Sequence, residues 1–285
     1  MRHLVTVAGA TGYLGRHIVA ALVEGGHSVR ALVRSRASAE QPGSFGAPSL
    51  EGLVAQWRIV DYALPSSLRD ACADTDRVIS ALGVTRQKAS PWDIDFLGNL
   101  HLLEDAERHE VSSFLYVNVI HSDTGTSLTT RSKHAFSQVL KRSLVAAQIV
   151  NPSGYFSDIT DFLLMAEKGL GLTIGDGAAK LNPVHGADLA EFIVAKCTGP
   201  AGAWNVGGPD IMSYQELEQL VFAIADRRAH ILRLGPRTVR ALIGIADHSS
   251  PQASNLARFF LEGLGQEAVG TPIGTRHLEA YLRSL

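Results

Sequence analysis

The chain has 285 residues and a mass of 30.5 kDa, with 46% hydrophobic and 19% charged residues. This composition excludes a disordered chain and is typical of a globular enzyme. The formal net charge of −2, with no run of five basic residues, gives no reason to expect nucleic acid or an anionic membrane as a partner. No apolar run is long enough to span a membrane, and a strand expected from residue 3 leaves no room for a signal peptide. We therefore expect a cytoplasmic protein.

The two cysteines, Cys72 and Cys197, are too few for a disulfide framework. Each falls in an expected helix among small apolar residues, so we predict two reduced thiols in the core. No metal site is predicted.

The first 150 residues alternate short β-branched runs with amphipathic stretches. This pattern predicts a parallel sheet with helices on both faces, a doubly wound α/β fold of the Rossmann type. Strands are expected at residues 3–8, 28–33, 57–60, 77–81, 113–119 and 144–150. Helices are expected at residues 13–24, 66–73, 92–108 and 130–143. Residues 36–49, rich in Ser, Pro, Gly and Ala, resemble a mobile surface loop.

After residue 150 this rhythm ends. The sequence predicts helices at residues 158–168, from about Asp188, and after a capping box at Ser213–Glu216. A Gly-rich stretch occupies residues 169–177, and two or three amphipathic helices are expected between residues 232 and 285. Residues 151–285 should supply the last strands, interleaved with a small and mostly helical substrate-binding region, in one structural domain overall with the core at residues 1–150.

The most specific motif is Gly9-Ala10-Thr11-Gly12-Tyr13-Leu14-Gly15, which follows the first strand and opens the first helix. In such a motif the first glycine permits a tight turn, the second lets the backbone approach a pyrophosphate, and the third lets the helix pack closely on the sheet. The N–H groups of the helix N-terminus then face the phosphates. We predict dinucleotide contacts from Gly9, Thr11, Gly12, Tyr13 and Leu14; a Gly-rich turn without a ligand is the alternative.

The end of the second strand indicates which dinucleotide binds. An acidic residue there would bond the ribose 2′-hydroxyl of NAD, whereas arginine suits the 2′-phosphate of NADP. Here Arg34 follows the strand, with Arg36 nearby and no acidic residue in reach. Because the guanidinium can stack on adenine and bond a phosphate, Arg34 predicts NADPH as the cofactor. A solvated surface arginine is the alternative.

Several phrases together resemble the atypical short-chain dehydrogenases/reductases, and most closely their NmrA-like branch. The resemblance extends to about residue 225. It rests on the glycine motif, on Lys133 opening the helix after the fifth strand, and on four further phrases. These are Val78-Ile79-Ser80-Ala81-Leu82-Gly83, Asn151-Pro152-Ser153-Gly154-Tyr155-Phe156, Asn182-Pro183-Val184-His185-Gly186-Ala187-Asp188-Leu189-Ala190 and Trp204-Asn205-Val206-Gly207-Gly208-Pro209.

The resemblance implies a role for each matching residue. Asp61 would lie beside the adenine, and Lys133 would bond the nicotinamide ribose. The passage to that ribose would be lined by Ala81, Leu82 and Gly83. The carboxamide and the substrate pocket would be flanked by Pro152, Ser153, Tyr155 and Phe156. His185 and Asp188 would be structural.

The chain departs from this family at the catalytic pair. The family's reductases use a Tyr four residues before the Lys and a Ser at the end of the fifth strand, but this chain has Thr129 and Asn118 there. An aliphatic alcohol is too weak an acid to replace a phenol. We therefore predict that Asn118 contacts the substrate and does not take part in proton transfer. The proton could come from Lys133, Tyr155, His121, water or an acidic hydroxyl on the substrate.

Two functions remain open at this point. The first is NADPH-dependent reduction of a ketone on a large aromatic substrate, an aromatic polyketide or a quinone, because the cofactor supplies the demanding chemistry. The missing Tyr resembles ketoreductases of angucyclinone antibiotic biosynthesis. The second is an NADP(H)-sensing regulator of the NmrA-like kind that has lost the chemistry. The sequence shows no exposed apolar stripe or charge run for a partner protein, which favours the reductase; the oligomeric state is open.

Overall fold

The computed structural model describes residues 2–84 and 89–285. The chain forms two compact units, and we describe each by itself. The first unit comprises residues 2–118, 132–151 and 186–204. The second unit comprises residues 119–131, 152–185 and 205–285.

The first unit is built on a parallel sheet whose strands follow the order β6-β5-β4-β1-β2-β3. The strands are β1 (Leu4–Ala8), β2 (Ser28–Val33), β3 (Gln56–Ile59), β4 (Arg77–Ser80), β5 (Ser113–Val117) and β6 (Ala146–Pro152). Beyond β6 come β9 (Gly202–Gly207) and β12 (Thr271–Pro272), which complete eight strands. This is the doubly wound order predicted from the sequence, with its reversal between β1 and β4, so the expected Rossmann-type fold is confirmed.

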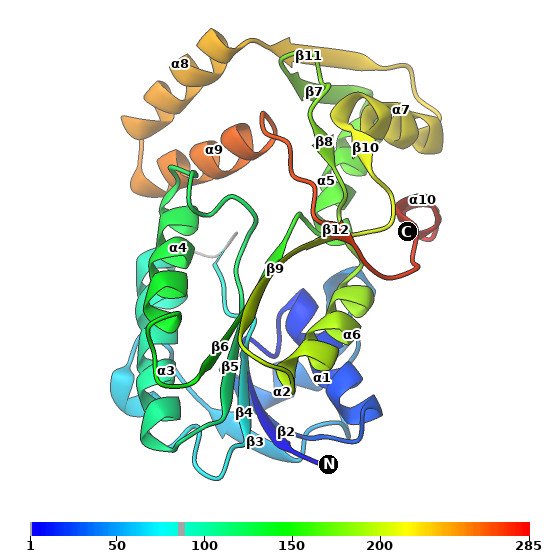
Figure 1. Cartoon of the computed structure of the whole chain (residues 1–285). Coiled ribbons are helices and arrows are strands. Elements are labelled where there is room, and N and C mark those ends of the chain that lie inside the picture. The colour runs from blue at the N-terminus through cyan, green and yellow to red at the C-terminus, as the bar shows by residue number, and fades with distance from the viewer. Residues whose placement is uncertain (1, 85–88) are drawn as a thin grey trace. The chain divides into compact units, whose positions relative to one another are not determined.

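Helices cover both faces of this sheet. Figure 1 shows α3 and α4 on one face and α1 and α6 on the other. Their bounds are α1 (Tyr13–Glu24), α3 (Asn99–Arg108), α4 (Leu128–Leu140) and α6 (Gly186–Cys197). A π-helical segment, η3 (Trp92–Gly98), leads into α3. Buried aromatic and aliphatic side chains, Phe114 and Phe136 among them, fill the space between the sheet and α3 and α4.

Two predicted features of this unit are corrected. The helix expected at residues 66–73 is only a 3-10 turn, η2 (Pro65–Leu68), because Asp70 and Asp74 take positive φ and the Asp105 carboxylate accepts the N–H groups of Asp70 and Cys72. Cys72 therefore lies in a turn and not in a helix. Both cysteines are buried and free, with Cys197 at the end of α6.

Residues 36–49 are also more ordered than a mobile loop. They contain α2 (Arg36–Ala39) and the short 3-10 turn η1 (Ser44–Gly46). The buried guanidinium of Arg16 on α1 donates hydrogen bonds to the carbonyl oxygens of Ser38, Ala39, Gln41 and Pro48. These bonds hold the segment that follows β2 against α1.

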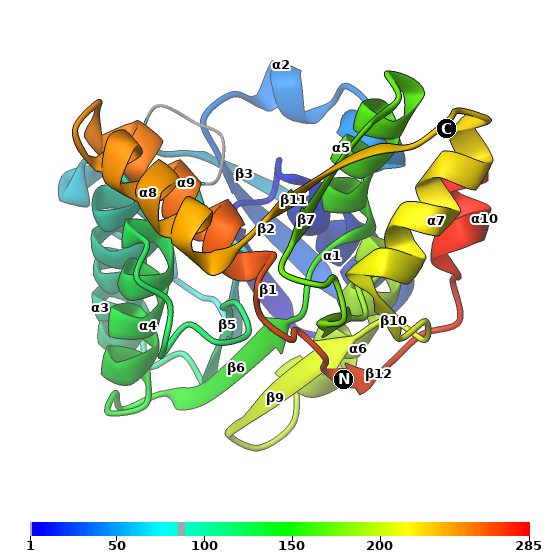
Figure 2. The ribbon, with the colours of Figure 1, turned by 90° about the horizontal axis from the view of Figure 1, so that it is seen from above.

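The helices of the second unit are α5 (Phe156–Glu167), α7 (Tyr214–Ala225), α8 (Pro236–Asp247), α9 (Pro251–Gly263) and α10 (Leu278–Arg283). The capping box is confirmed, with Ser213 and Glu216 bonding each other's backbone N–H at the start of α7. The expected two or three C-terminal helices are α8, α9 and α10; α8 and α9 pack side by side (Figure 2).

Two small sheets belong to this unit. The Gly-rich stretch contains β7 (Leu170–Ile174), which pairs in parallel with β11 (His230–Leu234). The short strands β8 (Lys180–Leu181) and β10 (Met212–Ser213) pair antiparallel. Within residues 2–84 and 89–285, no helix is long and apolar enough to cross a membrane.

Candidate functional site

The glycine turn between β1 and α1 has the geometry that the motif predicts. Gly9 has φ +72°, and a Cβ there would lie 2.6 Å from the carbonyl oxygen of Ala81 at the end of β4. A Cβ on Gly15 would collide with the carbonyl oxygen of Gly9, so only glycine lets α1 approach the strand this closely. Gly12 has an ordinary φ of −71° and ends the turn, with its N–H bonded to the carbonyl oxygen of Gly9 at 3.0 Å. Glycine is therefore required at position 9 by its positive φ and at position 15 by the close approach of Gly9, but the backbone conformation does not require it at position 12.

The N-terminus of α1 can receive an anion. No side chain among the described residues caps it, and its first turn contains no acidic residue. The positive end of the helix dipole and the first N–H groups, including those of Tyr13 and Leu14, therefore favour a phosphate. The phenol of Tyr13 accepts the N–H of Gly186 at the start of α6, and the carbonyl of Thr11 accepts Arg16 Nε at 3.0 Å. These residues thus fix the turn, and the cofactor contacts predicted for their backbones stay a prediction.

Tyr62, which sequence reasoning missed, ties the glycine turn to the end of β2. Its buried phenol accepts the N–H of Gly9 at 3.1 Å and donates to the carbonyl oxygen of Leu32 at 3.2 Å. Burial raises the pKa of this phenol, and the nearby Arg34 charge opposes the rise. The partners are 53 and 30 residues away along the chain, so no local pattern could have indicated them.

The two arginines after β2 differ in their surroundings. Arg36 Nε bonds Glu40 at 2.7 Å, and its guanidinium lies over the Trp57 ring, 5.5 Å from the centroid. Arg34 is exposed, and within the described part of the chain its side chain has no hydrogen bond or ion pair. Arg34 is therefore the cation that a 2′-phosphate could engage without displacing another partner.

Asp61, predicted to lie near the adenine, is exposed one residue after Val60. Its carboxylate accepts the N–H of Ala63 at 3.0 Å, and its own N–H donates to the hydroxyl of Ser67. The residue thus shapes the turn after β3, and its adenine contact stays a prediction.

Lys133 is a residue of α4, and its ammonium reaches the end of β4; the ribose contact that the resemblance implies stays a prediction. Its ammonium is 2.9 Å from Asp95 Oδ1 and donates to the carbonyl oxygen of Leu82 at 3.3 Å. The side chain of Asp95 is completely buried and that of Lys133 is 12% exposed. Ala81, Leu82 and Gly83 thus lead from β4 to a partly accessible cation. Residues 85–88 lie outside the described part.

Tyr116 is a second phenol that the sequence did not single out. It is fully buried on β5, and the Lys133 ammonium lies 5.4 Å from its ring centroid. Burial raises the pKa of Tyr116, and the Lys133 charge opposes this effect. Because no part of the side chain is exposed, Tyr116 cannot itself touch a substrate.

The two departures from the family's catalytic pair are both bonded to protein groups. Asn118 Nδ2 donates to Asn151 Oδ1 at 2.9 Å in the first unit. In the second unit, Thr129 is buried, and its N–H and hydroxyl bond Asn255 of α9. The α4 N-terminus is capped by Ser127, whose hydroxyl accepts the N–H of Thr130, and not by Thr129. Neither position presents an acid.

His121, proposed as a proton source, belongs to the second unit. It has φ +57°, and its Nε2 lies 2.7 Å from the carbonyl oxygen of Glu267. Since a carbonyl only accepts, this nitrogen carries a proton that is already bonded. A neutral His121 would then have only an accepting nitrogen left, which argues against it as the proton donor.

The segment 152–156 is held by packing in the second unit. Ser153 donates its N–H to Val206 and its hydroxyl to the carbonyl oxygen of Asn182, while Pro152 is buried. Tyr155 is half-buried and forms an isolated bridge with Val184. The cofactor and substrate contacts predicted for Pro152, Ser153 and Tyr155 stay predictions.

Phe156 is placed differently from its prediction. It is fully buried, and its ring packs against those of His185 and Tyr281 at 5.6 and 5.4 Å. The structure therefore assigns it to the core of the second unit and not to a substrate surface. His185 packs in the same aromatic cluster and Asp188 lies in the first turn of α6; the structural roles expected of both stay predictions.

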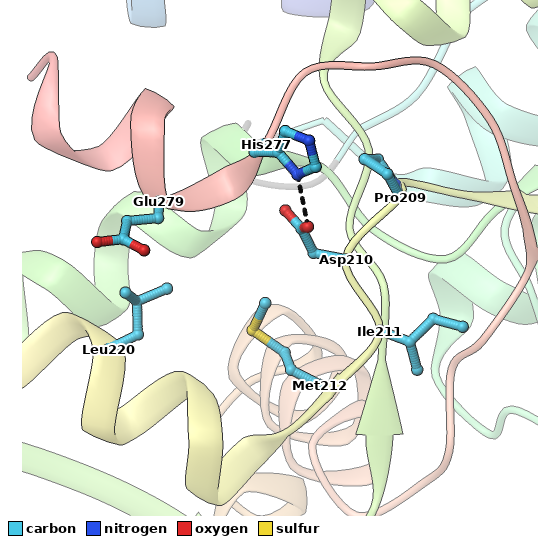
Figure 3. Close-up of a pocket in the computed structure, with 7 residues that line it drawn as sticks. All are labelled: Pro209, Asp210, Ile211, Met212, Leu220, His277 and Glu279. Atoms are coloured by element: carbon cyan, nitrogen blue, oxygen red, sulfur yellow. Dashed lines mark hydrogen bonds and ion pairs between the residues drawn. The ribbon is translucent and has the colours of Figure 1, made fainter.

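The second unit also has an open hollow of about 540 Å³ between the β9–β10 connection, α7 and the start of α10 (Figure 3). Asp210 Oδ1 bonds His277 Nδ1 at 2.7 Å, and Asp210 Oδ2 accepts the N–H of Leu278. None of the residues predicted to bind cofactor or substrate lines this hollow. It is separate from the predicted site residues.

A family model described as NAD(P)H-binding matches residues 9–198. This chain belongs to that NAD(P)H-binding family, and the expected resemblance to atypical short-chain dehydrogenases/reductases of the NmrA-like kind is confirmed. The match includes the glycine turn, Arg34 and Lys133.

Two curated relatives illustrate the similarity. Divinyl chlorophyllide a 8-vinyl-reductase of Zea mays is 25% identical over 259 residues, which cover 85% of this chain and 64% of the relative. The chain thus spans less than two thirds of that relative's length. A 4-hydroxy-2-methyl-3-oxo-4-farnesyl-3,4-dihydroquinoline-1-oxide ketoreductase of Stigmatella aurantiaca is 32% identical over 121 residues, 41% of this chain and 33% of the relative.

Solved structures share the fold at low sequence identity. NADPH-dependent quinone oxidoreductase QOR2 of Escherichia coli, in complex with NADPH, is 16% identical with a TM-score of 0.75 and covers 98% of each chain. Triphenylmethane reductase of Citrobacter sp. is 15% identical with a TM-score of 0.76, again over 98% of each chain. These likenesses support the Rossmann-type fold.

Proposed function

We propose that this protein is an NADPH-dependent ketoreductase that acts on an aromatic polyketide or quinone-like substrate without the usual Ser–Tyr pair. The observation that carries the proposal is the order of three features at the carboxyl ends of adjacent strands. Arg34 follows β2, the glycine turn follows β1, and the Lys133–Asp95 pair lies at the end of β4. A 2′-phosphate, a pyrophosphate and a nicotinamide ribose would meet these features in that sequence.

In this reaction NADPH supplies a hydride to the carbonyl carbon, and the carbonyl oxygen takes up a proton. The roles of the chain are to bind and orient. Arg34 would hold the 2′-phosphate, the N–H groups of α1 the pyrophosphate, and Lys133 the ribose hydroxyls. Thr129, at the position of the family's Tyr, is not a phenol, and its hydroxyl is bonded to Asn255. The nearby phenol of Tyr116 is fully buried and cannot reach the substrate.

The proton therefore comes from outside this pair. We propose that the substrate carries it, as an acidic hydroxyl beside the ketone, with Tyr155 and Lys133 as the remaining candidate donors from the chain. The named substrates of two similar proteins, a quinone in Escherichia coli and a quinoline oxide in Stigmatella aurantiaca, support an aromatic ketone class.

The test is NADPH oxidation by the purified protein with matched ketones. One ketone carries a neighbouring phenolic hydroxyl, its partner has that hydroxyl methylated, and a quinone and a simple aliphatic ketone complete the panel. We expect turnover of the hydroxylated ketone and loss of activity on the methylated one, with NADPH binding unchanged. Full activity on the methylated ketone would exclude substrate assistance.

An NADP(H) sensor is the second candidate, and the bonded state of Thr129 and Asn118 favours it. Tight NADPH binding with no oxidation across the whole panel would support the sensor and overturn the reductase.

A further inference from the structure

We infer that Asp95 is a positioning residue of the cofactor site, because its carboxylate fixes both the Lys133 ammonium and the backbone after β4 and compensates the charge of Lys133. The inference rests on the proposed function only in assigning Lys133 to the ribose. Nothing in the sequence pattern pointed to Asp95.

The two oxygens of the Asp95 carboxylate contact two different parts of the site. One oxygen of Asp95 faces Lys133 Nζ at 2.9 Å, and the other accepts the N–H of Val84 at 2.9 Å. Lys133 in turn donates to the carbonyl oxygen of Leu82. The carboxylate and the ammonium thus hold the segment 82–84 from two sides, and moving one would move the others.

The segment that carries Asp95 is held in place by buried hydrogen bonds. It lies in η3, a π-helical segment, and such segments are rare and frequently occur at functional sites. Asn99 donates to the carbonyl oxygen of Asp95 at 2.8 Å and receives a hydrogen bond from Ser80 at the end of β4. These side chains are fully buried, so the π-helical turn is fastened to the strand that precedes segment 82–84.

Gly83 lies directly against the Lys133–Asp95 ion pair. A Cβ on Gly83 would lie 3.2 Å from Lys133 Nζ and 3.4 Å from Asp95 Oδ1. Gly83 therefore lets the chain pass directly over the ion pair, leaving only part of the ammonium exposed.

Because the ion pair is largely buried, the charge of Lys133 depends on the Asp95 carboxylate. Within the described residues, Asp95 from η3 and Tyr116 from β5 face the ammonium. Burial disfavours the charged form of a lysine, and a carboxylate in contact restores it. Without the carboxylate, Lys133 should lose its proton at a lower pH, because the anion 2.9 Å from its ammonium is gone.

The test measures the dissociation constant of NADPH against pH for the unaltered protein and for Asp95→Asn, which keeps the side-chain shape. We expect the dissociation constant of Asp95→Asn, divided by that of the unaltered protein, to rise by ~10-fold or more between about pH 6 and about pH 9. The ratio rises because Lys133 loses its proton in the variant and keeps it in the unaltered protein. A ratio that is constant with pH would show a merely structural role and overturn the proposal. Glu104→Gln, on the exposed side of α3, is the charge-matched control and should leave the ratio near one.

A double variant guards against failure to fold. In Asp95→Asn with Lys133→Met the titrating group is gone, so NADPH binding should be weak but should show no added pH dependence. If Asp95→Asn alone does not fold and the double variant does, the Lys133 charge without its carboxylate is the cause and the proposal stands. If neither folds, Asp95 is needed for folding independently of Lys133, and the proposal that it acts on the cofactor site through Lys133 is overturned. Because the readout is binding, a protein that reduces no ketone would refute the proposed function and leave this test intact.

Discussion

The groups that could meet a ligand differ in kind between the two units. In the first unit they are backbone N–H groups at a helix start and the ends of two long cationic side chains, Arg34 after β2 and Lys133 on α4. In the second unit the corresponding candidates, His121, Ser153 and Phe156, are bonded or packed within the unit. A binding site for an invariant cofactor can be built from backbone geometry, whereas a substrate site depends on side chains that packing can also claim. Changes at the glycine turn and at Arg34 in the first unit should therefore alter NADPH binding, and changes at Thr129 and Tyr155 in the second should leave NADPH affinity intact.

The largest effects are expected in the glycine turn, where position decides the outcome. Gly15→Val should prevent α1 from packing on the turn and destabilise the fold by about 1–3 kcal/mol or more. Gly12→Val should keep the fold, since its φ is ordinary, but abolish NADPH binding by blocking the approach of the pyrophosphate. Circular dichroism and NADPH titration on the same preparations measure both effects. Undiminished binding by the Gly12 variant would mean that the phosphates lie elsewhere.

The next effect concerns the choice of cofactor. The unaltered protein should bind NADPH at least tenfold more tightly than NADH, because a charge-assisted hydrogen bond contributes about 1.5–3 kcal/mol. Arg34→Ala should remove most of this preference with little change for NADH. Arg36→Ala is the matched control, since Arg36 already bonds Glu40 and covers Trp57. Equal affinity of the unaltered protein for both cofactors would contradict the assignment.

These two predictions use residues that the sequence identified, and the reason is physical. A positive φ at Gly9, a close approach at Gly15 and a cation directly after β2 follow from local backbone constraints, so their spacing along the chain is diagnostic. Tyr62 and Asp95 act through partners 53 and 38 residues away, which only the folded chain brings together. The same limit explains Phe156: whether an aromatic residue lines a pocket or fills a core depends on Tyr281, more than a hundred residues later.

Tyr62 offers a smaller test inside the first unit. Tyr62→Phe leaves the N–H of Gly9 without its acceptor and should cost about 1–3 kcal/mol. The thermal midpoint should fall by roughly 2–4 °C per kcal/mol, and NADPH binding should weaken because the turn is less fixed. Tyr214→Phe, which removes a long 3.4 Å bond in the second unit, should leave NADPH binding unchanged. Equal losses of binding in the two variants would erase the distinction between the units.

The smallest effects are expected in the second unit, at the position that the family gives to its catalytic phenol. Thr129 lies on the buried start of α4, and its hydroxyl is bonded to Asn255. Thr129→Val preserves the shape but deprives Asn255 of a partner, so it should cost about 1 kcal/mol of stability. Turnover should fall far less than the ~10²–10⁴-fold typical of losing a general acid.

Tyr155→Phe provides the comparison, because Tyr155 is the only phenol among the residues predicted to touch substrate. If the substrate supplies the proton, both variants should keep kcat within about tenfold on the hydroxylated ketone, with NADPH affinity intact. Collapse of Tyr155→Phe alone would assign the proton to that side chain. Collapse of Thr129→Val would show that this position takes part in the chemistry despite its bond to Asn255.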